Sequence, residues 1–127
     1  MTSREEMETL LRGFYAARVR GDLRAVADTF APNAKFEISG PSDASSISTI
    51  AVGVGEFRPL LGAMIKTFTL KDYGIIAILI DGENAAVHWR AKVHSNITGK
   101  TAVTEFVDLI HVRNWRIDSY MEFFVKR

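Results

Sequence analysis

The chain has 127 residues, of which 47% are hydrophobic and 24% are charged, and this balance predicts a single globular domain over residues 1–127 with a core of its own. Its 16 Lys and Arg and 15 Asp and Glu are mixed along the chain without a basic run, so neither nucleic acid nor a membrane is an expected partner. The lack of Cys excludes disulfides, thiolate metal sites and a cysteine nucleophile.

The first half of the chain has the periodicity of helices. Apolar residues recur every three or four positions near the N-terminus, and Arg18 continues the same stripe, which predicts an amphipathic helix over Arg4–Arg20. A second helix begins after the N-cap residue Asp22. We expect this helix to carry Phe30 on its apolar face and to stop at Pro32.

A short strand, a loop and a third helix complete this half. The strand is expected over residues 34–39. Segment 40–55 is rich in Gly, Ser and other small residues without a clear period, which predicts a long loop or lid. The third helix has an apolar face from Phe57 to Phe68, and Pro59 is expected in its first turn, where backbone N–H groups lack partners anyway.

From Lys71 onward the hydrophobic period is two, which is typical of strands. Asp81-Gly82 predicts a type I′ hairpin turn, because both central residues of that turn need positive φ. Further turns are expected around Thr98-Gly99, taken as a two-residue loop, and at Arg113-Asn114-Trp115, a three-residue loop. The strands are expected near residues 70–81, 84–96, 101–113 and 115–125.

Helices first and antiparallel strands after predict an α+β fold, with three N-terminal-half helices packed on one strongly curved antiparallel sheet. With this order of elements, the segments RGDLRAVADTFAPNAKFEISG and VDLIHVRNWRIDSYMEFF resemble the nuclear transport factor 2-like superfamily. That superfamily includes ketosteroid isomerases, SnoaL-like polyketide cyclases and limonene epoxide hydrolases. The resemblance covers nearly the whole chain and implies a cone-shaped fold that encloses a pocket and often forms dimers, while the chemistry depends on a few side chains.

Side-chain alternation predicts which residues face the helices. In residues 86–95 the apolar set that includes Val87 and Trp89 alternates strictly with charged residues and histidines, and it must face inward. With the turns predicted above, Asp108 lies opposite Trp89 on one side and Tyr120 on the other, so Asp108 also faces inward. A β-bulge would reverse part of this assignment. The residues of the last strand that are expected to face inward are Asp118, Tyr120, Glu122 and Phe124.

Asp108 is the first candidate catalytic residue, because an ionised acid in an apolar strand costs on the order of several kcal/mol unless it is paired, hydrogen-bonded or protonated. We expect a raised pKa that lets Asp108 exchange a proton with a carbonyl compound, while Tyr120 and Trp89 hold it in place. Glu122 is the second candidate, since two neighbouring acids push one pKa upward, although Glu122 could also lie solvated at the pocket mouth. The expected substrate-binding residues are Phe14, Phe36, Ile38, Trp89, Phe106, Tyr120 and Phe124.

The resemblance to ketosteroid isomerases carries over one site residue only. Asp108 falls where those enzymes keep a protonated aspartic acid that donates to the substrate oxyanion, whereas Phe14 stands at the catalytic tyrosine and Ile38 at the general base. Tyr15 is one position away, and we expect it to point to another face of the helix. Phe106 occupies the place where limonene epoxide hydrolases would be expected to have an arginine. A SnoaL-like or generic small-molecule pocket is the remaining interpretation.

Two functions are therefore kept open. The first is cofactor-free proton transfer on a hydrophobic carbonyl or polyketide-like substrate, and the second is a non-catalytic binding or carrier module that uses the same pocket. A structural subunit in which Asp108 only specifies packing is a third interpretation. The three histidines fall on the outward side of their strands, so no metal site is expected.

Two further expectations concern assembly and location. The outward face of the last two strands carries an apolar patch larger than a monomer usually leaves in water, which predicts a homodimer through the outer sheet face. The N-terminal sequence lacks the apolar core of a signal peptide, and no stretch reaches the roughly 18 apolar residues of a membrane span, so a cytoplasmic location is expected. The patch residues are Val103, Val107, Leu109, Ile117, Met121 and Phe123.

Overall fold

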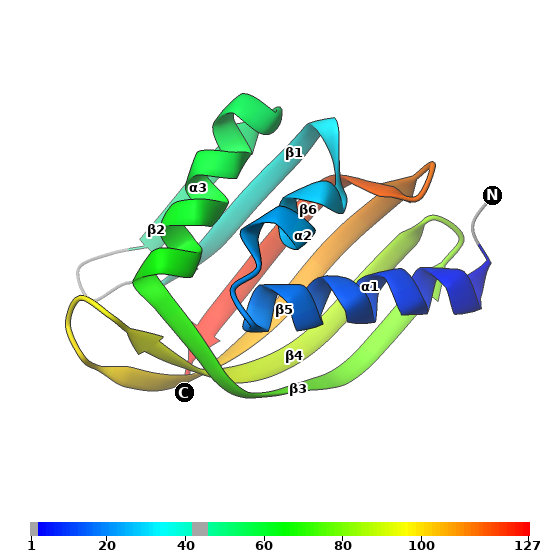
Figure 1. Cartoon of the computed structure of the whole chain (residues 1–127). Coiled ribbons are helices and arrows are strands. Elements are labelled where there is room, and N and C mark those ends of the chain that lie inside the picture. Colours follow the sequence, from blue (N-terminus) through cyan, green and yellow to red (C-terminus); the bar gives the residue numbers. More distant parts are fainter. Residues whose placement is uncertain (1–2, 42–45) are drawn as a thin grey trace.

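The computed structural model of the chain describes residues 3–41 and 46–127, and within them three helices pack against one six-stranded sheet (Figure 1). The helices are α1 (Arg4–Val19), α2 (Leu23–Asp28) and α3 (Val54–Thr67). The strands are β1 (Phe30–Pro41), β2 (Ser46–Val52), β3 (Phe68–Asp81), β4 (Asn84–Ser95), β5 (Thr101–Arg113) and β6 (Arg116–Lys126).

The strand order in the sheet is β2-β1-β6-β5-β4-β3. Every neighbouring pair is antiparallel except β1 and β6, which are parallel. All three helices lie on one face of the twisted sheet, and the sheet is not closed, because β2 and β3 remain its edges (Figure 1). The predicted α+β class is therefore confirmed, but the prediction of a wholly antiparallel sheet is wrong, because β1 and β6 run parallel.

The starts of α1 and α2 follow their capping residues. The Ser3 hydroxyl accepts a hydrogen bond from the Glu6 backbone N–H while the Glu6 carboxylate accepts one from Ser3, both at 3.2 Å, which forms a capping box. Asp22 caps α2 as predicted. The expected extent of α2 is wrong, however, because the helix ends at Asp28 and Phe30 begins β1. Residues that precede a proline disfavour helical φ and ψ, so the helix stops before Pro32 is reached.

Segment 40–55 is not the continuous loop that its composition predicts. Residues 46–52 form β2, which pairs with β1 so that Ala51 lies opposite Phe36. The part of the predicted loop at residues 42–45 lies outside the described residues. The strand has the alternation of burial that is typical of a sheet, since Ala51 is buried while Ile50 and Val52 are exposed. Its sequence does not show this alternation, because the buried residue is small and the exposed ones are apolar.

Helix α3 begins earlier than predicted. Gly53, with φ of 82°, turns the chain out of β2 into a helix that starts at Val54, so Pro59 lies beyond the first turn and not within it. Its missing N–H removes the bond to the Gly55 carbonyl. Phe68, which is predicted on the helix face, begins β3 instead.

The turns occur close to where they were predicted, but the first is shifted by one residue and the other two differ in length. The first hairpin places Gly82, with φ of 62°, as the first of two loop residues, because Asp81 pairs with Asn84. The second connection spans five residues, 96–100, between β4 and β5. The third is a two-residue loop of Asn114 and Trp115, which have φ of 51° and 66°.

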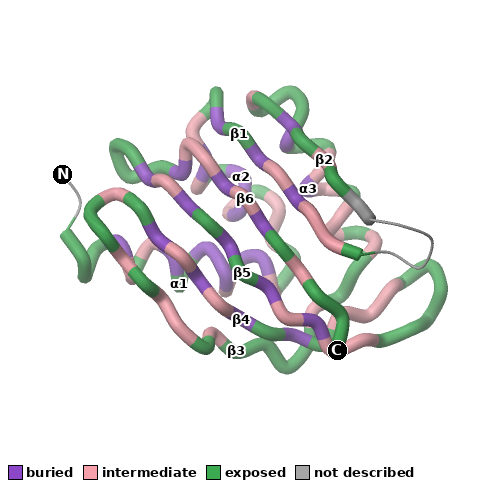
Figure 2. The backbone as a smooth tube through the Cα atoms, turned by 180° about the vertical axis from the view of Figure 1, so that it is seen from behind, coloured by how far each residue is buried: buried purple, intermediate pink, exposed green. Residues whose placement is uncertain are grey.

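The longer loop after β4 shifts the pairing of Asp108 by two positions, and on the other side the shorter loop after β5 and a β-bulge each shift it by one. The inward assignment of Asp108 therefore survives while its neighbours change. Asp108 pairs with Val87 and Glu122, not with Trp89 and Tyr120. Figure 2 views the sheet from the side opposite the helices, and buried and exposed residues alternate along β4 and β5 as the predicted parity requires.

A β-bulge reverses the parity at the start of β6. His111 pairs with Ser119 while the next residue, Val112, pairs with Ile117, so Asp118 is the extra residue. Ile117 is fully buried and does not belong to the outer patch. Asp118 contacts His111 instead of facing inward. Both predictions for these two residues are wrong for this reason.

Candidate functional site

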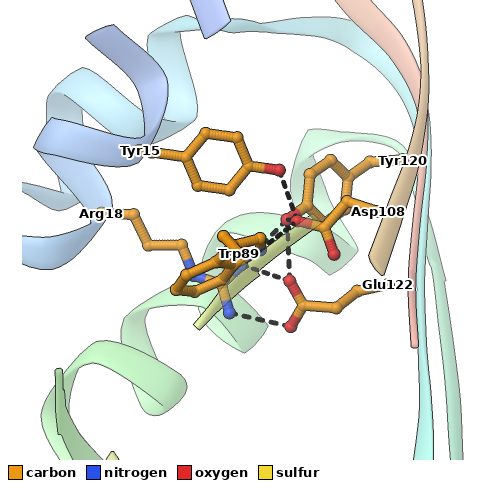
Figure 3. A network of polar contacts seen from close by, with 6 residues as sticks. All are labelled: Tyr15, Arg18, Trp89, Asp108, Tyr120 and Glu122. Carbon is orange, nitrogen blue, oxygen red and sulfur yellow. Dashed lines mark hydrogen bonds and ion pairs between the residues drawn. The ribbon is translucent and has the colours of Figure 1, made fainter. Parts of the chain in front are cut away.

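Six polar or aromatic side chains from four elements converge between α1 and the sheet (Figure 3). Asp108 and Glu122 are 0% and 1% exposed, and Arg18 is 9% exposed. Tyr15, Trp89 and Tyr120 are completely buried. The residues are Tyr15 and Arg18 from α1, Trp89 from β4, Asp108 from β5, and Tyr120 and Glu122 from β6.

One oxygen of Asp108 collects three hydrogen bonds. Its Oδ2 atom accepts from the Trp89 Nε1–H at 2.8 Å, from the Tyr120 hydroxyl at 2.5 Å and from the Tyr15 hydroxyl. The contacts with Trp89 and Tyr120 match the expectation from the sequence. The Oδ1 atom is buried and has no partner among the described residues, which is uncommon for a buried polar atom.

Glu122 forms a two-point ion pair with Arg18. Arg18 Nη1 donates to Oε2 at 2.5 Å and Nη2 donates to Oε1 at 2.9 Å. The guanidinium also lies 5.1 Å from the centre of the Trp89 ring and 5.9 Å from that of Phe106, so aromatic faces cover it. Glu122 is thus buried in the interior, not solvated at a mouth.

The Tyr120 hydroxyl joins the two acids. It lies 2.5 Å from Asp108 Oδ2 and 2.8 Å from Glu122 Oε2, and it accepts from Arg18 Nη1 at 2.9 Å. A hydroxyl carries one proton, so it donates to only one of the two acids at a time. The cluster is therefore one connected network and not two separate pairs.

The two acids have pKa values that are pushed in opposite directions. Burial, and after it repulsion by Glu122, raises the pKa of Asp108 well above its ordinary value, against the opposing effect of Arg18. Burial also acts to raise the pKa of Glu122, but the charge and hydrogen bonds of Arg18 outweigh it and hold that pKa below its ordinary value. Within this pair Asp108 therefore holds a proton more readily than Glu122.

The residues predicted to line a pocket do lie in the interior, but side chains fill the space around Asp108. Phe106 stacks on Trp89 with ring centres 3.9 Å apart, and Phe36 stacks on Tyr120 at 5.2 Å. Phe14 contacts the Tyr15 ring edge to face at 5.1 Å. Ile38 is buried, and Phe124 is half-buried next to Phe106. A ligand can reach Asp108 only by displacing some of these side chains.

A depression of about 460 Å³ lies elsewhere, over the outer side of the sheet. Its walls include Leu79, Leu109 and Met121, which belong to the face turned away from the helices. It therefore does not reach the two acids. Its other lining residues are Ile80, Asp81, Asn84, Ala85, Ala86, Ile110, His111 and Ser119.

Sequence reasoning missed Tyr15 and Arg18 as site residues. The expectation that Tyr15 turns away from Phe14 is wrong, because α1 buries an arc wide enough to include both neighbours. The sequence did contain a signal for Arg18, since a charged residue on an apolar helical stripe needs a buried partner. That partner, Glu122, is 104 residues away and could be paired with Arg18 only once the strand parity was known.

The comparisons with known proteins agree with this fold. The model of the SnoaL-like domain family matches residues 11–120, so the chain belongs to the SnoaL-like domain family. The structure resembles a proposed isomerase from Bacillus subtilis with a TM-score of 0.84 at 18% identity, covering 98% of this chain and 90% of that one. A comparison with curated proteins found no match.

Two further solved structures share the fold. An NTF2-like protein from Burkholderia xenovorans LB400 gives a TM-score of 0.76 at 20% identity, with 98% and 93% of the two chains covered. An LEH-like epoxide hydrolase from M. tuberculosis gives 0.72 at 16% identity, with 94% and 82% covered. At these identities the likeness establishes the nuclear transport factor 2-like fold and leaves the chemistry to the side chains.

In the described part of the chain, no three His, Asp or Glu side chains gather in a way that could hold a metal ion. None of the helices in residues 3–41 and 46–127 combines the length and apolarity needed to cross a membrane.

Proposed function

We propose that this protein catalyses cofactor-free proton transfer on a neutral, hydrophobic carbonyl compound of polyketide-like shape, with Asp108 as the acid. The observation that supports this most strongly is the asymmetry of the Asp108 carboxyl group. Three hydrogen-bonding groups surround Oδ2, while Oδ1 is buried without a partner. We place the proton of a neutral Asp108 on Oδ1, where it is an unused donor, because Oδ2 already has three hydrogen-bonding neighbours.

A ligand carbonyl oxygen that replaced the packing next to Oδ1 would accept this hydrogen bond. When a proton leaves the carbon next to that carbonyl, negative charge develops on the oxygen, and the Asp108 O–H stabilises it or transfers its proton. Glu122 is the candidate base, because two carboxyl groups whose environments push their pKa values apart divide into an acid and a base. To accept a proton, Glu122 has to loosen its contacts with Arg18.

The surroundings also restrict the ligand. Arg18 is already neutralised by Glu122, so an anionic ligand finds no spare positive charge in the interior. The rings of Phe106 and Trp89 favour a flat apolar molecule over a sugar or a phosphate. Phe14, Phe36, Ile38, Tyr120 and Phe124 are the other proposed contacts.

A non-catalytic binding module is the second candidate function. It is favoured by the hydrogen bonds of the buried network. Arg18 Nη1 and Nη2 and both carboxylate oxygens of Glu122 already have partners within the protein. A ligand could then bind by packing against the aromatic residues without taking part in proton transfer. We also propose that two copies associate through the outer sheet face, where apolar side chains of β5 and β6 remain exposed.

A ligand screen with matched variants tests the proposal. Neutral aromatic ketones and polyketide-like carbonyl compounds are titrated into the protein while NMR spectra of the protein are recorded. We expect binding, and exchange of the protons next to the carbonyl with deuterated solvent, which Asp108→Asn abolishes. The control Asp28→Asn changes an exposed carboxylate at the end of α2 and keeps both binding and exchange. Binding without exchange in the unmodified protein supports the carrier function, and equal exchange with Asp108→Asn excludes Asp108 as the acid.

A further inference from the structure

The buried cluster contains two acids and one strong cation. Asp108 and Glu122 are directly paired residues of neighbouring antiparallel strands, and their side chains share the hydroxyl of Tyr120. Arg18 makes its two-point contact with Glu122 and reaches Asp108 only through Tyr120. If both acids were ionised, the cluster would carry one uncompensated buried negative charge, which is strongly unfavourable.

We infer that Arg18 is a positioning residue for the proposed acid: by pairing with Glu122 through both of its terminal nitrogens, it keeps the ionised state on Glu122 and the proton on Asp108. This inference rests on the proposed function for its catalytic meaning. The distribution of the proton is nevertheless a property of the unliganded protein. It can therefore be measured without any substrate.

The polar and titratable groups that face Asp108 come from α1, β6 and β4. Helix α1 contributes Tyr15 and Arg18, β6 contributes Tyr120 and Glu122, and β4 contributes the uncharged indole of Trp89. Burial holds both tyrosines neutral by raising their pKa values well above the ordinary value. The charges that act on Asp108 are therefore those of Glu122 and Arg18.

Two substitutions are expected to change the number of protons held by the buried acids in opposite directions. In Glu122→Gln, the shape is kept but Arg18 faces a single ionisable acid, so Asp108 becomes the partner of the cation and loses its proton. In Arg18→Met, the length and apolar packing are kept but the cation is gone, so neither buried acid has a reason to ionise. Arg18→Lys restores the positive charge without the two-point contact, so it tests whether the charge alone keeps Glu122 ionised.

Infrared difference spectroscopy detects these states, because a protonated carboxyl group has a C=O band that a carboxylate lacks. Spectra are recorded near pH 7 for the unmodified protein and the three variants, and Asp108→Asn identifies the Asp108 band. We expect the Asp108 band in the unmodified protein and in Arg18→Lys, and its loss in Glu122→Gln. We expect a second carboxyl band in Arg18→Met. If Arg18→Met does not fold, Glu122→Gln alone decides the question.

An Asp108 band that persists in Glu122→Gln overturns the inference, because the proton then depends on burial alone. A band that is absent from the unmodified protein overturns it as well. Near-UV circular dichroism checks that Trp89 and the tyrosines keep their native packing in each variant. The ligand screen is independent of these spectra, so a failure to find a substrate removes the proposed function while the position of the proton stands.

Discussion

At Asp108 two opposing effects act on one carboxyl group. Three hydrogen bonds to Oδ2 favour a carboxylate, whereas burial and the neighbouring Glu122 favour the neutral acid. The tyrosine hydroxyls can rotate and accept as well as donate, so only the Trp89 N–H requires an acceptor at this position. Because Arg18 supplies one positive charge for two acids, the neutral form of Asp108 is the state that balances the buried charge.

This protonation state predicts how stability depends on pH. The raised pKa of Asp108 means that the folded chain keeps a proton that the unfolded chain releases above about pH 4. The free energy of unfolding therefore declines as pH rises from there through the native pKa of Asp108, by at most about 1.4 kcal/mol per pH unit. Glu122 has the opposite sign: its pKa is lowered, so its contribution is present above about pH 4.3 and is lost as pH falls through the native value.

Urea unfolding between pH 5 and pH 8, compared with Asp108→Asn, isolates the effect of Asp108, because Glu122 is ionised in both states there and the three histidines are common to both proteins. We expect the free energy of unfolding to decline with pH in the unmodified protein and to decline less in Asp108→Asn, which cannot titrate. Asp28→Asn is the control, and its curve should run parallel to that of the unmodified protein. Parallel curves for Asp108→Asn would mean that Asp108 is already ionised at pH 5.

At the scale of elements, α1 and β6 cooperate through spacing that each shows in its own sequence. Helix α1 presents Phe14, Tyr15 and Arg18 on its buried side, and β6 presents Tyr120 and Glu122 at alternate positions. The alternation along β4 and β5 made the inward position of Asp108 predictable. The pairing of Arg18 with Glu122 was not predictable, because it depends on how α1 crosses the sheet, and no local pattern encodes that angle.

Loop lengths set the limit on predicting contacts between strands. The five-residue connection after β4 places Val87 and not Trp89 opposite Asp108. The two-residue loop after β5 and the bulge at Asp118 together place Glu122 and not Tyr120 on its other side. Parity survived because the net shift of Asp108 was two residues on each side. β2 was missed for a different reason, since small residues weaken the hydrophobic alternation on which strand prediction depends.

Two glycines in different elements should respond oppositely to replacement by alanine. In β1, a Cβ atom on Gly40 would lie 2.4 Å from Cε1 of Phe124, so the ring would have to move. In α1, a Cβ atom on Gly13 would meet nothing within 4 Å. We expect Gly40→Ala to lower the free energy of unfolding by about 1 to 3 kcal/mol through overpacking. Gly13→Ala should raise it by about 0.5 to 1 kcal/mol through its higher helix propensity.

Urea denaturation at one pH measures both changes, and Gly13→Ala serves as the matched control for a glycine-to-alanine exchange. An unchanged stability for Gly40→Ala would show that Phe124 moves aside at little cost.

At the scale of the whole molecule, the outer sheet face carries apolar side chains that no helix covers. Val107 and Phe123 are paired across β5 and β6 and are each 42% exposed, and the next outward pair on the same strands is Leu109 with Met121. Leu79 and Ala86 extend this row across β3 and β4. With Ile117 removed from the predicted patch, these residues still form a continuous strip, next to the depression described above.

A second copy of the chain is the proposed cover for this strip. A two-fold axis through the face would place each copy's Val107 and Phe123 against the same region of the other, burying about 1,200 to 2,000 Å² in total. We expect sedimentation velocity at micromolar concentration to show a dimer, and Val107→Lys to shift it to monomer by placing a charge in the contact. Ile97→Lys is the matched control, because Ile97 is 79% exposed on the loop between β4 and β5, outside the strip, and it should leave the dimer intact. A monomer in the unmodified protein, or a dimer that survives Val107→Lys, would show that the outer face of β5 and β6 is not the contact between copies.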